Sequence, residues 1–218
     1  MATNANDETK RRSFLREAMK VLPIDIQNPD QATLEYAARM TAAGAVVVFP
    51  SDSCYGLATN AANTEAVVRL YKIKQRPFDK QISCIFRDMA QIKEWGEIGP
   101  KEQRTLERNL PGPFTFILHA KAEYPLDSPS LGVRIPNSVL TRSLSNLLNS
   151  PYTATSANRG GLDPSYSLED IHRQFDGQIY QPDVMLDAGR LPQYPPSAVI
   201  DIRDGKKQII REGVARVR

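Results

Sequence analysis

The chain has 218 residues, of which 41% are hydrophobic, and a formal net charge of +3. This length and apolar content suffice for one substantial core, so we expect a single domain. The small net charge excludes a protein that wraps nucleic acid with a strongly basic surface. The two cysteines, Cys54 and Cys84, form no CxxC pair, which argues against a disulfide framework or a zinc site.

The first 20 residues are polar and charged and predict a flexible extension ahead of a domain over residues 21–218. Asp7 and Glu8 interrupt the basic character that an organelle-targeting sequence needs. No apolar run approaches the roughly 20 residues of a membrane span, and the start lacks the apolar core of a secretory signal. We therefore expect a cytoplasmic protein without membrane association.

Helical and strand patterns alternate along the rest of the chain. Helices are predicted over 30–43, 63–74, 101–109, 139–148 and 167–174, with another that is opened by Asp88. Strands are predicted over 45–49, 82–86, 114–118, 132–135, 152–155, 184–186, 198–202 and 208–211, with a hairpin turn at Asp204-Gly205. This interleaving predicts an α/β fold with a mixed sheet.

A hydroxyl-rich run and a cationic cluster stand out. The run Phe49-Pro50-Ser51-Asp52-Ser53-Cys54-Tyr55-Gly56-Leu57 is interpreted as a turn at the end of the buried strand 45–49. The charges of Lys74, Arg76 and Lys80 follow the next predicted helix. Because charge-assisted hydrogen bonds are strong and guanidinium groups match phosphate oxygens, the two features together predict a nucleotide site.

Further hydroxyl and cation pairs occur where strands meet loops. Ser130 precedes Arg134, which interrupts an apolar strand and therefore needs either a structural carboxylate or a ligand as its partner. Small polar residues and glycines fill 153–161, Ser197 precedes an apolar strand, and Arg211 ends one. Taken singly, each of these motifs is better explained by an ordinary structural role.

Several familiar chemistries are absent from the sequence. It contains no GxxxxGK[ST], GxGxxG, GxSxG or HExxH motif. His119 and His172 lie far apart in the chain, which argues against a histidine-based triad. Catalysis should therefore depend on positioning and electrostatics.

In this order, the motifs resemble those of the YrdC-like threonylcarbamoyl-AMP synthases, also called TsaC, from about Pro29 to Gly213. The opening Pro-Thr-Asp/Glu-Thr-x-Tyr-Gly-Leu motif of that family corresponds to Pro50–Leu57, with serines in place of threonines. The later motifs correspond to Lys74-Gln75-Arg76-Pro77, Pro111-Gly112-Pro113-Phe114-Thr115, Arg134-Ile135-Pro136, Ser156-Ala157-Asn158, Ser197-Ala198-Val199 and Arg211-Glu212-Gly213.

The resemblance implies a single YrdC-like domain in which a twisted mixed β-sheet and flanking helices surround a deep, positively charged cleft. It implies that ATP, L-threonine and bicarbonate react there to give threonylcarbamoyl-AMP and pyrophosphate, for threonylcarbamoyladenosine modification of tRNA. Mg²⁺ would accompany ATP, held by phosphates and water. The implied partners are these small molecules, tRNA or double-stranded RNA, and indirectly the tRNA-modification machinery.

The resemblance also assigns site residues. Those implied for L-threonine are Ser53, Arg134, Ser156 and Ser197. Those implied for ATP are Arg76, Lys80, Ser130, Asn158, Ser167 and Arg211, and the catalytic charges are Lys74 and Arg76. No protein ligand to a metal is assigned, and Asp52 and Asp187 are the only acids considered near one.

The chain also departs from the family pattern. Lys80-Gln81-Ile82 replaces the usual Lys-Pro-Leu, and 82–88 is similar to the YciO-like branch. One alternative is therefore a YciO-like protein that acts on already modified tRNA or lacks synthase activity. The other is an RNA-binding module that uses the same cleft without chemistry.

Overall fold

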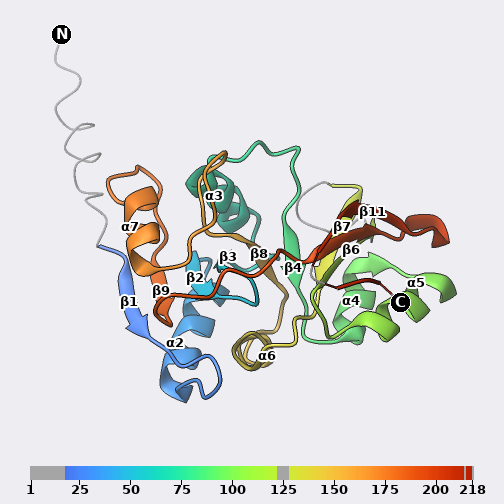
Figure 1. Cartoon of the computed structure of the whole chain (residues 1–218), viewed down its shortest axis with the longest axis horizontal. Coiled ribbons are helices and arrows are strands. Elements are labelled where there is room, and N and C mark those ends of the chain that lie inside the picture. The colour runs from blue at the N-terminus through green and yellow to red at the C-terminus, as the bar shows by residue number, and fades with distance from the viewer. Residues whose placement is uncertain (1–17, 122–127, 214, 218) are drawn as a thin grey trace, which may run out of the picture.

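The computed structural model describes residues 18–121, 128–213 and 215–217, which form a mixed α/β fold (Figure 1). The strands are β1 (Lys20–Pro23), β2 (Val47–Pro50), β3 (Tyr55–Ala58), β4 (Ser83–Ile85), β5 (Gly96–Glu97), β6 (Phe114–Ala120), β7 (Ser130–Arg134), β8 (Tyr152–Ser156), β9 (Val184–Asp187), β10 (Ala198–Asp201) and β11 (Gln208–Arg211). The α-helices are α2 (Gln31–Ala42), α3 (Thr64–Lys74), α4 (Met89–Trp95), α5 (Pro100–Asn109), α6 (Val139–Asn146) and α7 (Leu168–Phe175).

All strands join one 11-stranded sheet in the order β1-β9-β2-β3-β8-β4-β7-β6-β10-β11, with β5 paired to β6. The sheet contains both parallel pairs, such as β4 with β7 and β6 with β10, and antiparallel pairs, such as β2 with β3 and β6 with β7. The predicted mixed α/β sheet is therefore confirmed. The predicted hairpin at Asp204-Gly205 is also confirmed, because β10 pairs antiparallel with β11 across it.

Side-chain caps begin the helices where the sequence predicts. The carboxylate or amide oxygens of Asp30, Asn63 and Asp88 accept backbone N–H groups at the first turns of α2, α3 and α4. Ser167 does the same for α7. Gly44 follows α2 with a positive φ of 88°, a conformation that glycine adopts without strain.

Three strands, β1, β3 and β5, are missing from the sequence-based prediction. The interpretation of 49–57 as one turn is wrong at its end, because Tyr55–Ala58 forms β3 and pairs with β2. All four residues of β3 are buried, so the segment lacks the apolar–polar alternation that marks a half-buried strand. The predicted N-terminal extension falls on 1–17, which lies outside the described residues, and on the start of β1.

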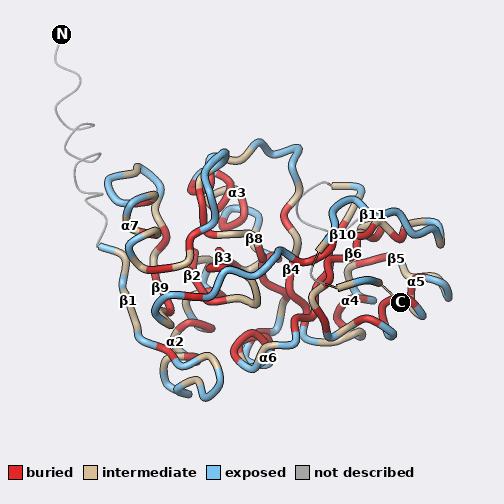
Figure 2. The backbone as a smooth tube through the Cα atoms, in the orientation of Figure 1, coloured by how far each residue is buried: buried red, intermediate tan, exposed pale blue. Residues whose placement is uncertain are grey.

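Helices cover the sheet unevenly. Around β2 and β9, α2 and α6 pack on one face of the sheet, while α3 and α7 pack on the other (Figure 1). Around β6, β7 and β10, α4 and α5 cover one face and build a third apolar core. Buried segments run through all three regions (Figure 2). None of the described helices has the length and apolar character to span a membrane.

Candidate functional site

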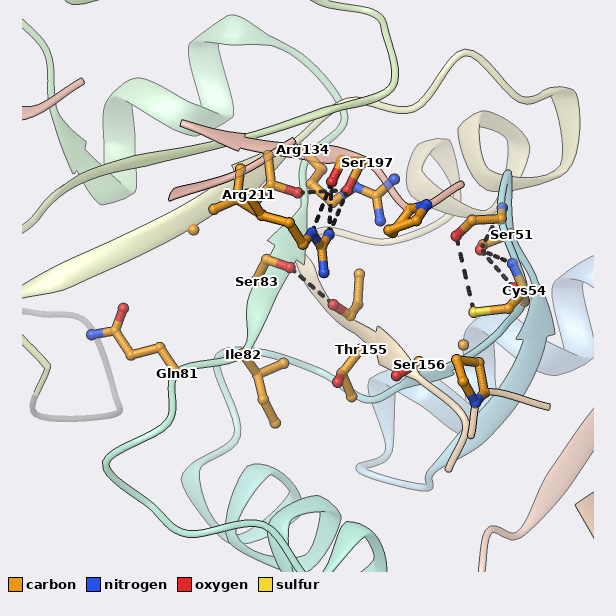
Figure 3. A pocket seen from close by; sticks show the side chains of 18 of the residues that line it. Ser51, Cys54, Gln81, Ile82, Ser83, Arg134, Thr155, Ser156, Ser197 and Arg211 are labelled. Atoms are coloured by element: carbon orange, nitrogen blue, oxygen red, sulfur yellow. Dashed lines mark hydrogen bonds between the residues drawn. The ribbon is translucent and has the colours of Figure 1, made fainter. Parts of the chain in front are cut away.

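A cavity of 470 Å³ lies on the sheet face that α4 and α5 leave uncovered. Alternation along the strands places Phe114 and Phe116 of β6 in the core, while Thr115 and Ile117 line the cavity. The turn before β3 and the end of β8 complete the wall, and Figure 3 shows the side chains that converge on this space. The cavity is thus built where one half of the sheet meets the other.

The lining combines hydroxyl groups with guanidinium groups. Among the described residues it includes three arginines, Arg76, Arg134 and Arg211, and no aspartate or glutamate. Its serine and threonine hydroxyl groups come from Ser51, Ser53, Ser83, Thr115, Thr155, Ser156 and Ser197. The predicted threonine-site residues Ser53, Arg134, Ser156 and Ser197 therefore share one cavity with Arg76 and Arg211, which are predicted to contact ATP.

Arg134 is held by a carboxylate. Its Nη2 donates to both carboxylate oxygens of Asp52, at 2.9 and 3.0 Å, and its side chain is only 10% exposed. Its Nε is buried and has no partner among the described residues. Arg134 thus has the structural carboxylate that was one of its two predicted partners. It also lines the cavity and retains N–H groups that Asp52 does not use.

Arg76 is fixed by the loop that carries it. Its Nε donates to the carbonyl of Lys80 at 2.8 Å, and its Nη2 donates to the carbonyl of Gln81 at 3.0 Å. Tyr71 braces the same loop by donating its hydroxyl to the Lys80 carbonyl at 3.1 Å. These neutral acceptors orient the guanidinium without neutralising its charge.

A β-bulge orients Arg211. Val199 pairs with Arg211, but Ile200 pairs with Ile209, so Ile210 is the extra residue in β11. The Arg211 guanidinium donates to the Ser197 carbonyl from Nε at 3.1 Å and from Nη2 at 2.7 Å. Partial burial of the guanidinium, followed by the nearby positive charge of Arg134, lowers the pKa of Arg211. These contacts bring the last strand to the cavity.

Lys74 joins two motifs from behind the cavity wall. It is only 3% exposed, and its Nζ donates to the Ser156 carbonyl at 2.6 Å and to Oδ1 and the carbonyl of Asn158 at 2.9 and 3.1 Å. In return, the Gly160 N–H donates to the Lys74 carbonyl at 2.7 Å. Burial, followed by the charge of Arg76, lowers the pKa of Lys74 to about 8. Neither Lys74 nor Asn158 is among the described lining residues.

Three residues predicted to contact ATP lie outside the cavity lining. The side chain of Lys80 is exposed, and Ser130 Oγ donates to Gln81 Oε1 at 2.5 Å. Ser167 is buried and accepts the Asp170 N–H at 3.3 Å as the cap of α7. None of the three is among the described lining residues, so their roles toward ATP stay predictions.

Sequence reasoning assigned no role to several lining residues: Thr115, Thr155 and Gln81, which lie in segments that it singled out, and Tyr166 and Tyr194, which do not. For Thr115, the signal was its position between Phe114 and Phe116, because alternate residues of a strand point to opposite faces of the sheet. Tyr166 and Tyr194 come from connecting loops, for which no periodic pattern exists. Cys54 also lines the cavity, but burial raises the pKa of its thiol, which disfavours the nucleophilic thiolate.

The acids considered near a metal both have partners in the protein. Asp52 contacts Arg134, and Asp187 Oδ1 accepts the Tyr55 hydroxyl at 3.3 Å. Within the described ranges, no cluster of three or more His, Cys, Asp or Glu side chains could hold a metal ion. The cavity wall offers hydroxyl groups and cations, which suit a ligand that carries its own anionic oxygens.

Comparison with known proteins places the chain in a family. The Sua5/YciO/YrdC family model, described as "Telomere recombination", matches residues 39–213. The chain belongs to the Sua5/YciO/YrdC family. A Methanocaldococcus jannaschii relative named "Putative threonylcarbamoyl-AMP synthase" is 33% identical over 183 residues, which is 83% of this chain and 86% of the relative.

Solved structures of the Sua5/YciO/YrdC family have the same fold. Escherichia coli YciO superposes with a TM-score of 0.80 at 27% identity, covering 91% of this chain and 98% of its own. P. abyssi Sua5 complexed with L-threonine superposes with a TM-score of 0.78 at 24% identity. That match covers 90% of this chain and 58% of Sua5, so this chain spans little more than half of the Sua5 length.

Proposed function

We propose that the protein is an L-threonylcarbamoyladenylate synthase, which forms threonylcarbamoyl-AMP and pyrophosphate from ATP, L-threonine and bicarbonate. The observation that carries the proposal is the convergence of three oriented arginines and several serine hydroxyls on one cavity without a lining carboxylate in the described part of the chain. Such a wall favours a ligand with several anionic oxygens. The relative named as a synthase supports the same function.

The reaction suits a site without a general base. Condensation of the threonine amine with bicarbonate gives a carbamate and water. A carbamate oxygen then attacks the α-phosphorus of ATP, the bond from that phosphorus to the bridging oxygen breaks, and pyrophosphate leaves. Alignment and stabilisation of negative charge supply the catalysis, as in other phosphate-transfer reactions.

In this proposal, the two ligands contact different residues of the cavity wall. L-Threonine would place its carboxylate at Arg134 and its polar atoms near Ser53, Ser156 and Ser197. ATP would place its phosphates at Arg76 and Arg211. The carbamate and the α-phosphate then meet between the β2–β3 turn and the sheet, in a positively charged cleft.

Mg²⁺ would enter with ATP. The described lining offers serine and threonine hydroxyls and no carboxylate, which fits an ion that takes most of its ligands from phosphate oxygens and water. Bound in this way, the ion would neutralise phosphate charge. The resulting threonylcarbamoyl-AMP would serve the modification of tRNA, which makes tRNA an indirect partner.

Pyrophosphate release tests the proposal. We expect release from ATP only when both L-threonine and bicarbonate are present, and a loss of at least about 100-fold in Arg76→Ala, as for other groups that stabilise transferring phosphates. Arg104→Ala is the matched control, because Arg104 is exposed on α5. Release that does not depend on threonine would overturn the proposal.

The likeness to E. coli YciO over 98% of the length of that chain motivates the second candidate, a YciO-like protein acting on modified tRNA. Mass spectrometry of modified tRNA after incubation with the protein separates the two, because the alternative removes the threonylcarbamoyl group, whereas a synthase that acts on small molecules leaves the tRNA unchanged. RNA binding with a steep salt dependence and no ATP binding would instead favour a binding module.

A further inference from the structure

Gln81 lines the cavity at a position where the family pattern has proline, and it connects two segments of the wall. Its backbone carbonyl accepts Arg76 Nη2 at 3.0 Å. Its side-chain Oε1 accepts the Ser130 hydroxyl at 2.5 Å, and its Nε2 donates to Ser128 Oγ. One residue therefore holds both the loop that carries Arg76 and the first residue of β7. A proline could make only the carbonyl contact.

The hydrogen bonds around Gln81 have one consistent direction. Ser128 Oγ donates its single proton to the Ser130 carbonyl at 3.1 Å, so it must accept from Gln81 Nε2. The amide oxygen of Gln81 then faces Ser130, whose hydroxyl must donate to it. These hydrogen bonds need no ligand, so the network can form before a ligand binds.

This network constrains the loop that carries Arg76. The Arg76 guanidinium uses Nε and Nη2 for the carbonyls of Lys80 and Gln81, so its position depends on how that loop is held. The side chain of Gln81 fixes the loop to β7, whose last residue is the cavity arginine Arg134. Figure 3 shows Gln81 at the edge of the cavity, with its carboxamide directed away from the Ser197 and Arg211 side.

We propose that Gln81 is a positioning residue for the nucleotide, which holds the Arg76 loop against β7 so that the Arg76 guanidinium meets the phosphates of a nucleoside triphosphate. The identity of this ligand rests on the proposed function. Gln81 acts through Arg76, so replacing Gln81 should weaken nucleotide binding and leave amino-acid binding unchanged. The network also uses the Ser130 proton, so Ser130 acts through Gln81 and donates no hydrogen bond to phosphate.

Calorimetric titration of the full chain with α,β-methylene-ATP and, separately, with L-threonine tests the proposal. In Gln81→Ala we expect the affinity for the ATP analogue to fall about tenfold, the size of one or two lost hydrogen bonds, with threonine affinity changed less than about twofold. Gln81→Met keeps the length of the side chain and should behave alike if the alanine variant fails to fold. Gln103→Ala is the matched control, since Gln103 bonds Glu107 on α5.

A double-mutant cycle adds a readout that general destabilisation would not produce. If Ser130 acts through Gln81, the losses of ATP-analogue affinity in Gln81→Met and Ser130→Ala should be far from additive in the double variant. Unchanged analogue affinity, equal losses for both ligands, or additive losses would each overturn the inference while the wild type still binds. Absence of analogue binding by the wild type would overturn the proposed function as well.

Discussion

Lys74 shows how a charged residue of a binding motif can serve the fold. Its ammonium is buried and contacts neutral oxygens of Ser156 and Asn158. An ammonium has three N–H groups to donate, and here they hold the turn that follows β8 in place. The basic motif and the Ser-x-Asn motif are therefore one structural unit, in which Arg76 faces the cavity and Lys74 faces the protein.

The lowered pKa of Lys74 gives a stability prediction. Its folded-state pKa is about 8, below the ordinary 10.5, so between these values the unfolded chain binds more protons than the folded chain. The contribution of Lys74 to the unfolding free energy should therefore rise with pH across this window, by at most about 3 kcal/mol. Urea unfolding of the wild type and Lys74→Met from pH 7 to 10 measures the difference. A difference that shrinks as pH rises would contradict the assignment.

The pair of Arg134 and Asp52 predicts a link between ligand and stability. Asp52→Asn leaves the buried guanidinium without its counter-charge, which should lower the unfolding free energy by about 3 kcal/mol. A carboxylate ligand would then replace the lost charge, so L-threonine should raise the melting temperature more in Asp52→Asn than in the wild type. Thermal unfolding with and without threonine measures this. Asp201→Asn, which loses a pair with Arg203, should respond to threonine like the wild type.

At the scale of elements, the sequence predicted what periodicity and caps encode. The bounds of α2, α3 and α7 agree with prediction to within one residue at the N-terminus, because Asp30, Asn63 and Ser167 provide caps. Short strands that are buried on all sides or contain two residues, such as β3 and β5, carry no such signal. The site was predicted from motifs, but the pairing of Arg134 with Asp52 depends on strand order and could not be.

Ser167 predicts a separable effect at the start of α7. As the cap it accepts the Asp170 N–H, so Ser167→Ala should lower the unfolding free energy by about 1 kcal/mol. Ser167→Asp keeps an acceptor and should restore most of that stability. Urea denaturation measures both variants. An aspartate variant as unstable as the alanine variant would show that the cap is not the main role of Ser167.

The same substitution separates capping from the predicted ATP contact. If Ser167 also contacts ATP, the carboxylate of Ser167→Asp should repel the phosphates and weaken ATP binding more than Ser167→Ala does. If Ser167 only caps the helix, the aspartate variant should bind ATP as the wild type does. Titration with the ATP analogue distinguishes these outcomes independently of stability.

For the whole molecule, the uneven covering of the sheet explains where the cavity lies. One half of the sheet has helices on both faces, and the other half has α4 and α5 on a single face. Alternate residues of β6 and β7 line the open face, namely Thr115 and Ile117 and then Gly132 and Arg134, together with Val199 of β10. Ser53 and Ser156 come from one half, while Arg134, Ser197 and Arg211 come from the other, so a ligand that contacts both sets connects the halves.

This arrangement predicts where ligands slow hydrogen exchange. β11 is an edge strand whose four residues are all exposed, so its amides should exchange early in the free protein. The ATP analogue and L-threonine together should protect β11 through Arg211 and β8 through Ser156, whereas local exchange in α5 should not change, because α5 packs on the covered face. At about 100 times the dissociation constant, binding adds about 2.7 kcal/mol of stability, enough to slow exchange roughly 100-fold where the ligand controls opening.

Mass-spectrometric exchange measures all three segments at once. Equal protection of α5 and β11 would mean that the ligands stabilise the protein only globally, and protection of β8 without β11 would remove Arg211 from the nucleotide site.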